Sequence, residues 1–252
     1  MIEIFILSII QGVTEFLPVS SSSHLIIISK YLNFENQSLS IDVSLHIGSF
    51  IAVITYFRKD IVNFIKNKEL FFKIFLSSIP VMLTGFLLVK FELINQLRSL
   101  QVIGWTTIIF GILLYISDKF SVENKIDNNF TIKSAIIIGV LQIFSLIPGV
   151  SRSGITITAA RILKFNRFDS AKISFFLSIP TLAAVSFFGF KNLYISNNLD
   201  FSALNLTSIF LSFVFSFITI KFFLNYIKNF NLNVFVIYRI ILGIFLLIIA
   251  YL

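Results

Sequence analysis

The sequence predicts an all-α polytopic membrane protein, with six transmembrane helices plus two re-entrant helical hairpins in an inverted-topology repeat. Of the 252 residues, 57% are hydrophobic and 13% are charged, whereas a soluble domain has roughly 25% charged residues. The apolar runs are too continuous for barrel strands, which alternate, and only helices and closed barrels satisfy their backbone in lipid. Each half of the chain also begins with a short apolar stretch broken by proline and serine.

The first half begins with two apolar pieces, residues 2–17 and 24–32, separated by Pro18 and a run of serines. Neither piece comfortably reaches the roughly 20 residues that a span needs. We therefore predict a helical hairpin that enters the membrane and returns. A polar loop over 33–41, a span over 42–57, a polar segment, spans over 70–91 and 99–117 and a mixed-charge loop over 118–131 follow.

The second half repeats this order. Residues 132–147 are a short apolar arm, 148–154 a turn and 155–163 a short return. Three spans follow, at 171–194, 205–227 and 233–252. We predict a single membrane domain over 1–252, with one repeat at about 1–118 and the other at about 132–252.

Loop charges predict the orientation. If the segment after Phe57 is cytoplasmic, the cytoplasmic flanks hold Arg58, Lys59, Lys66, Lys68, Lys73, Lys119, Lys125, Lys133, Lys164, Arg167, Lys172, Lys221 and Lys228. The opposite side holds Lys30, Lys90, Arg98 and Lys191. This asymmetry follows the positive-inside rule and explains the net charge of +8 without a nucleic-acid partner, so we expect none.

The same orientation has consequences for the hairpins. The first begins and ends outside, the second begins and ends inside, and the C-terminus lies outside. Inverted repeats bring their broken helices together near the middle of the membrane. We therefore expect Glu15 and His24 to approach Arg152.

The second break, at Pro148-Gly149, is followed by Ser151, Arg152 and Ser153. Proline and glycine open the helix. An arginine among apolar residues needs an anion or a partner, and hydroxyls and amides at a helix start beside a guanidinium form a phosphate site. The alternative for Arg152 is an arginine that snorkels to the interface. We expect Arg161 to be such an interfacial charge.

The first break carries Gln11 and Glu15 on one helix face. They are candidate oxygen ligands for a hard divalent cation, or Glu15 is a base within reach of the serines. The alternative is a polar pair that caps the turn.

His24 follows Ser20–Ser23 directly, so it can share a turn with a hydroxyl, as a nucleophile and its base require. The alternative for the serines is that small residues let helices approach. For His46 we slightly favour a packing role, and the alternative is that it supports a residue of the site. With no cysteine there is no thiolate chemistry. Together the two breaks predict phosphoryl transfer from a lipid.

These segments resemble a known family. The stretch from Gln11 to His24 is similar to the (Glu/Gln)-x-x-x-Glu and Ser-Ser-x-x-His motifs of bacterial undecaprenyl-diphosphatases, the bacitracin-resistance family. Residues 148–156 match that family's Pro-Gly-x-Ser-Arg-Ser-x-x-Thr in full, and the resemblance spans the chain. The chain departs from the pattern at Gln11, where Glu is the other permitted residue, and at Ser22-Ser23, where Thr-Gly is commoner.

The resemblance implies removal of the terminal phosphate of undecaprenyl diphosphate, which recycles the carrier lipid for peptidoglycan synthesis. It implies a divalent cation (Mg²⁺ or Ca²⁺), and an active site that opens to the outer face of the bacterial inner membrane. The resemblance is compatible with a homodimer.

The resemblance also implies residue roles. By it, Glu15 is a base or, with Gln11, a metal ligand, Ser21 is the nucleophile, His24 the general acid/base and Arg152 the diphosphate clamp. The implied substrate-binding residues are Ser20, Ser22, Gly149, Ser151, Ser153 and Thr156.

Two rival functions were weighed. A type-2 phosphatidic acid phosphatase needs a histidine after its Ser-Arg pair, and no histidine follows Arg152. A lipid or anion transporter would share inverted repeats with broken helices. Such a carrier needs binding residues but not a nucleophile with a base, so Glu15, Ser21 and His24 favour the phosphatase.

Overall fold

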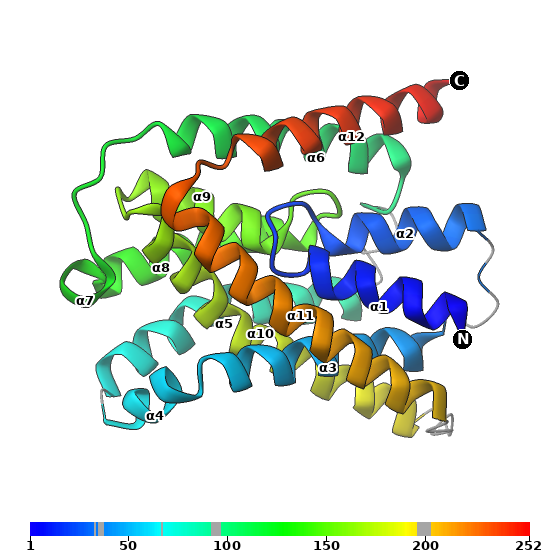
Figure 1. Cartoon of the computed structure of the whole chain (residues 1–252), viewed down its shortest axis with the longest axis horizontal. Coiled ribbons are helices and arrows are strands. Elements are labelled where there is room, and N and C mark those ends of the chain that lie inside the picture. Colours follow the sequence, from blue (N-terminus) through cyan, green and yellow to red (C-terminus); the bar gives the residue numbers. More distant parts are fainter. Residues whose placement is uncertain (33, 35–37, 67, 92–96, 196–202) are drawn as a thin grey trace.

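The computed structural model describes residues 1–252 except 33, 35–37, 67, 92–96 and 196–202 (Figure 1). Across the described residues the regular secondary structure is helical, apart from one isolated bridge between Asn124 and Phe165. The predicted all-α class is therefore confirmed.

Six helices are long and apolar enough to cross a membrane within the described ranges, as predicted. They are α3 (Leu39–Tyr56), α5 (Lys68–Lys90), α6 (Leu100–Asp118), α10 (Arg167–Ile195), α11 (Ala203–Asn229) and α12 (Asn233–Tyr251). Their bounds lie within a few residues of the predicted spans. The predicted loop over 33–41 lies partly outside the described residues.

Two predicted polar connections contain helix instead. The charged segment after Phe57 forms α4 (Arg58–Lys66), and the mixed-charge loop contains the short α7 (Ile126–Asn129). In α4, apolar residues recur at Ile61 and Ile65, the spacing of one helix face, while the other face is charged. An amphipathic segment of this kind folds as a helix although it is too polar to span.

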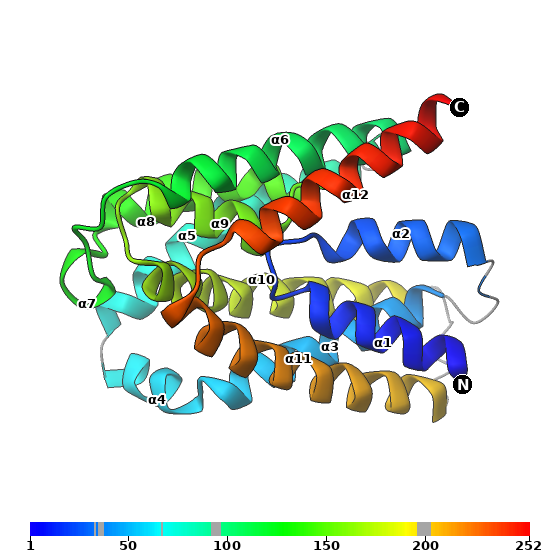
Figure 2. The same ribbon diagram turned by 45° about the horizontal axis from the view of Figure 1, so that its top comes forward.

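The two predicted hairpins are present. The first pairs α1 (Ile2–Thr14) with α2 (Ser21–Leu32), and the second pairs α8 (Ile132–Gln142) and a 3₁₀ turn, η2 (Ile143–Leu146), with α9 (Arg152–Ile162). All of these are shorter than the spanning helices (Figure 2). The return of the second hairpin begins at Arg152, earlier than predicted, because the Ser151 hydroxyl caps α9 by accepting from Gly154 N.

Contacts between the two halves occur in equivalent pairs: a contact between two helices has a counterpart between the corresponding helices of the opposite halves. Helix α1 packs on α11 as α8 packs on α5, and α3 packs on α11 as α10 packs on α5. Helices α6 and α12 lie side by side in both views (Figures 1 and 2). This is the pairing expected of inverted repeats, while the exact repeat limits stay a prediction.

Candidate active site

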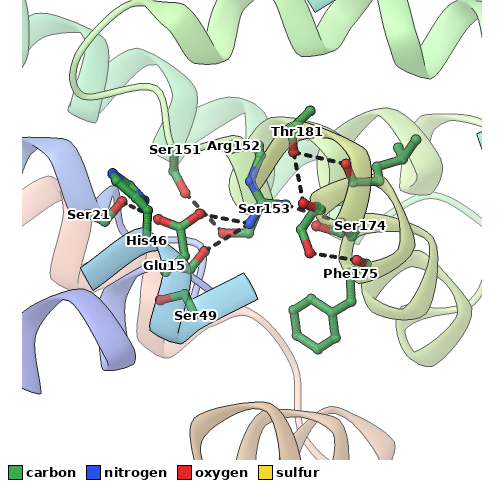
Figure 3. A network of polar contacts seen from close by, with 12 residues as sticks. Glu15, Ser21, His46, Ser49, Ser151, Arg152, Ser153, Ser174, Phe175 and Thr181 are labelled. Carbon is green, nitrogen blue, oxygen red and sulfur yellow. Dashed lines mark hydrogen bonds and ion pairs between the residues drawn. The ribbon is translucent and has the colours of Figure 1, made fainter. Parts of the chain in front are cut away.

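Glu15 joins the two breaks of the chain. It follows α1 directly and is buried. Arg152 Nη2 donates to its Oε1 at 3.0 Å, and Ser21 Oγ donates to its Oε2 at 2.8 Å. Figure 3 shows the carboxylate between these two side chains. The predicted approach of Glu15 to Arg152 is confirmed.

Arg152 is the first residue of α9 and points inward. Its Nη1 donates to the Ser174 carbonyl at 3.3 Å, and its Nη2 also approaches the Glu15 carbonyl at 3.4 Å. Only 13% of the side chain is exposed. Arg152 is therefore held at a carboxylate rather than snorkelling to an interface.

The His24 ring contacts a backbone carbonyl and a tyrosine hydroxyl. Its Nδ1 lies 2.6 Å from the Ser20 carbonyl, and its Nε2 is hydrogen-bonded to the Tyr238 hydroxyl of α12. Both ring nitrogens are thus directed away from Ser21, whose hydroxyl donates to Glu15 instead. The base in contact with the candidate nucleophile is the carboxylate and not the imidazole.

Gln11 and His46 extend the site. Gln11 Nε2 lies 3.2 Å from Glu15 Oε2 and 3.0 Å from His46 Nδ1. An ionised carboxylate only accepts hydrogen bonds, so the amide NH₂ faces both partners. His46 thereby contacts the site and does more than pack. This contact agrees with the alternative role for His46, that it supports a residue of the site.

Three hydroxyls that the sequence assigned to phosphate binding are used within the protein. Ser153 Oγ donates to the Leu17 carbonyl at 2.7 Å, and Thr156 Oγ1 donates to Ser174 Oγ at 2.7 Å. Ser151 Oγ is 3.2 Å from Ser153 Oγ, whose proton is already committed, so Ser151 donates there. A hydroxyl has one proton. In this structure the three hydroxyls therefore stabilise the turns, and their role in phosphate binding stays a prediction.

Gly149 also has a structural role. Its φ is +96°, and a Cβ there would overlap Thr106 Oγ1 and lie 2.7 Å from the Ile103 carbonyl oxygen. Only glycine fits this position. In the first turn, Ser20 is buried with its Oγ 2.9 Å from Ser23 Oγ, whereas Ser22 is exposed. Ser22 Oγ lies 3.3 Å from Ser20 Oγ, and its role in phosphate binding stays a prediction.

Arg239 of α12 is the main residue that the sequence analysis missed. It is fully buried. Its guanidinium donates to the carbonyls of Pro18 at 3.3 Å, Gly149 at 2.9 Å, Val150 at 3.0 Å and Thr107 at 3.2 Å. It thus ties the two turns together. An arginine within a predicted span is a functional signal, and this signal was available.

Arg161 corrects another expectation. It is buried rather than interfacial. It donates to the carbonyls of Phe165 at 2.6 Å, Asp118 at 2.8 Å and Phe120 at 2.9 Å, and its Nε lies 3.4 Å from an Asp118 carboxylate oxygen. Arg161 holds the ends of neighbouring segments instead of facing headgroups.

The oxygen ligands for a divalent cation are few. No cluster of three or more His, Cys, Asp or Glu side chains suited to a metal occurs among the residues that the structure describes. Gln11 Oε1, however, is buried and has no hydrogen-bond partner there. One carboxylate and one spare amide oxygen suit a cation that keeps water and substrate phosphates as its other ligands, as Mg²⁺ does.

Comparison with known proteins gives one consistent family. A family model described as bacitracin resistance protein BacA matches residues 4–245. A protein named undecaprenyl-diphosphatase from Pelagibacter ubique (strain HTCC1062) is 51% identical over 251 residues, which cover 99% of this chain and 98% of that protein.

Two further relatives carry the same name. The protein from Saccharophagus degradans (strain 2-40 / ATCC 43961 / DSM 17024) is 41% identical over 249 residues, covering 94% of this chain and 93% of the relative. The protein from Jannaschia sp. (strain CCS1) is 36% identical over 261 residues, covering 98% of each. The similarity therefore includes both hairpins and all six spanning helices.

Proposed function

The chain belongs to the bacitracin resistance protein BacA family, and on that premise we propose that its polar centre hydrolyses undecaprenyl diphosphate to undecaprenyl phosphate and inorganic phosphate. The protein is a multi-pass membrane hydrolase that recycles the carrier lipid for peptidoglycan synthesis. The observation that supports this reaction most directly is Glu15, which joins a serine hydroxyl to an arginine where the two hairpin turns meet.

Ser21 and Glu15 form the reacting pair in this proposal. The Ser21 oxygen attacks the terminal phosphorus, and its proton passes to Glu15 Oε2, 2.8 Å away. A serine–phosphorus bond forms, the anhydride bond breaks, and undecaprenyl phosphate leaves with the electron pair. Water then attacks the phosphorus and the serine–phosphorus bond breaks. Inorganic phosphate leaves, one water proton restores the Ser21 hydroxyl, and Glu15 loses its proton to the released phosphates or to solvent. Activation of a serine by an adjacent base is the general requirement for such a nucleophile.

Arg152 provides the positive charge. Its guanidinium offers several donors in one plane, which suits the oxygens of a phosphoryl group. In the absence of substrate it is paired with Glu15 Oε1 at 3.0 Å. A diphosphate would compete for these donors and leave Glu15 free to accept the serine proton. Charge stabilisation of this kind is the main task of a protein in phosphoryl transfer.

A divalent cation, Mg²⁺ or Ca²⁺, completes the proposal. Glu15 and the spare Oε1 of Gln11 would hold it. When bound, the cation would neutralise charge on the diphosphate. The protein residues then align the serine and keep its proton acceptor in place.

The orientation is also a proposal. The excess of Lys and Arg on one set of loops supports a C-terminus on the outer side of the inner membrane. That the site opens to the outer face is proposed from the family resemblance and not from the loop charges. A topology reporter fused after Leu252 tests this orientation. Signal from the outside is expected, and a cytoplasmic signal would refute it.

The direct test is phosphate release from undecaprenyl diphosphate by the purified protein in detergent, with and without Mg²⁺ or Ca²⁺. We expect cation-dependent release and its loss in Ser21→Ala, with Ser121→Ala as a surface control. Release that survives in Ser21→Ala would move the attack to water activated by Glu15. Lipid binding without release by the wild type would favour the transporter.

A further inference from the structure

Tyr238 contacts the site from a helix that neither motif includes. Its hydroxyl is hydrogen-bonded to His24 Nε2, and the two ring planes lie within 9° of each other with centroids 5.8 Å apart. Tyr238 and Arg239 are consecutive on α12. Arg239 binds the backbone of both turns, while Tyr238 contacts the side chain of the histidine. One helix therefore positions the loops and the imidazole together.

The partners of His24 determine its tautomer. A carbonyl oxygen only accepts hydrogen bonds, so the contact of 2.6 Å between Nδ1 and the Ser20 carbonyl requires a proton on Nδ1. In the neutral ring Nε2 then carries the lone pair, and the Tyr238 hydroxyl must donate to it. The atom of His24 that can gain or lose a proton during the reaction is therefore Nε2.

His46 has the opposite arrangement. The Gln11 NH₂ is directed at Glu15 Oε2, and the same nitrogen lies 3.0 Å from His46 Nδ1. Nδ1 of His46 is thus an acceptor, which leaves the proton on Nε2. The chain has two histidines, and their surroundings assign them different tautomers.

We propose that Tyr238 is a positioning residue of the phosphatase site, whose hydroxyl holds His24 so that Nε2 is its acid/base atom. This inference rests on the proposed function, because it assigns an atom to the acid/base role that the family resemblance implies for His24, beside the activation of Ser21 by Glu15. Tyr238 is 43% exposed, so burial of the residue does not by itself explain the contact between its hydroxyl and the imidazole. A phosphate oxygen at Nε2 can replace the phenol without rotation of the ring.

The first experiment is ¹⁵N NMR of the protein labelled at histidine, in detergent, with His46→Gln to assign the signals. We expect His24 with its proton on Nδ1 and His46 with its proton on Nε2. In Tyr238→Phe the Nε2 resonance of His24 should shift, while the signals of His46 stay in place. A proton on Nε2 of neutral His24, or a spectrum that Tyr238→Phe leaves unchanged, would refute the proposal.

The second experiment is kinetic. Tyr238→Phe keeps the ring and removes one hydrogen bond, so we expect kcat to fall on the order of tenfold with little change in KM. The pH dependence of kcat should also shift. In the background of His24→Gln the same substitution should have no further effect. Tyr251→Phe is the matched control, because that hydroxyl lies on the same helix and contacts Trp105 Nε1 at 3.4 Å.

The outcomes separate the two proposals. If the wild type releases no phosphate, the proposed function fails, and the NMR result still tests the tautomer. If the wild type is active and Tyr238→Phe retains its kcat and pH profile, only the role of Tyr238 fails. An additional loss in the background of His24→Gln would mean that the hydroxyl acts independently of the imidazole, which also contradicts the proposal.

Discussion

The two turns of the hairpins share a backbone design. Each ends in a serine with positive φ, Ser20 at 78° and Ser151 at 68°, and the returning helix begins at the next residue. Positive φ is uncommon outside glycine. Arg239 also binds one carbonyl in the first turn and two in the second. The same backbone conformation thus occurs in both turns, and the Arg239 side chain binds both.

The side chains at the start of the returning helices differ. The first helical residue is Ser21 in one hairpin and Arg152 in the other, and both reach Glu15. In the second turn the hydroxyls of Ser151 and Ser153 are committed to internal hydrogen bonds. The repeat therefore supplies the backbone of the site, whereas the reactive side chains come from residues that differ between its two copies.

The largest effect, a loss of folded protein, is expected from replacing Arg239, which binds carbonyls of both turns. Arg239→Met keeps the length of the side chain and deletes contacts to four carbonyls. Buried groups left without partners cost about 1–3 kcal/mol each, so we expect little folded protein. Size-exclusion chromatography and thermal unfolding in detergent measure this effect. Met at exposed Ile244 of the same helix is the control, and a wild-type unfolding midpoint for Arg239→Met would show that the turns hold without it.

The next largest effect, on kcat, is expected at Arg152, which occupies the position that Ser21 has in the first hairpin. Arg152→Lys can keep an ion pair with Glu15, so we expect the fold to survive. An ammonium cannot hold Glu15, the Ser174 carbonyl and a phosphoryl group in one plane. Loss of such charge stabilisation costs roughly 10²–10³ in kcat. Phosphate release measures it, with Arg58→Lys at an exposed position as the control. Near-normal turnover would remove Arg152 as the clamp.

Much of this architecture could be predicted from the sequence, since apolar length defines a span and the proline–serine breaks define the hairpins. Loop charge alone implied that Glu15 would approach Arg152. The hydrogen-bond partners of hydroxyls could not be predicted, because Ser153 binds Leu17 and Thr156 binds Ser174 only through tertiary contact. The contact between His24 and Tyr238 could not be predicted for the same reason, since Tyr238 lies far away in the sequence. Arg239 could have been found as a charge within a span.

The smallest expected effect tests whether the two backbones are equivalent. Glycine and alanine both remove the hydroxyl of Ser20 or Ser151, so the difference between these two variants isolates the cost of a Cβ at positive φ. That cost is about 1 kcal/mol, which corresponds to about 2–4 °C in the unfolding midpoint of a chain this size. We expect the unfolding midpoint of the glycine variant to be higher than that of the alanine variant, by a similar amount at both positions. A difference confined to one position would mean that the turns resemble each other in φ but are strained to different degrees. The two backbones would then differ between the repeats, as the side chains at the start of the returning helices do.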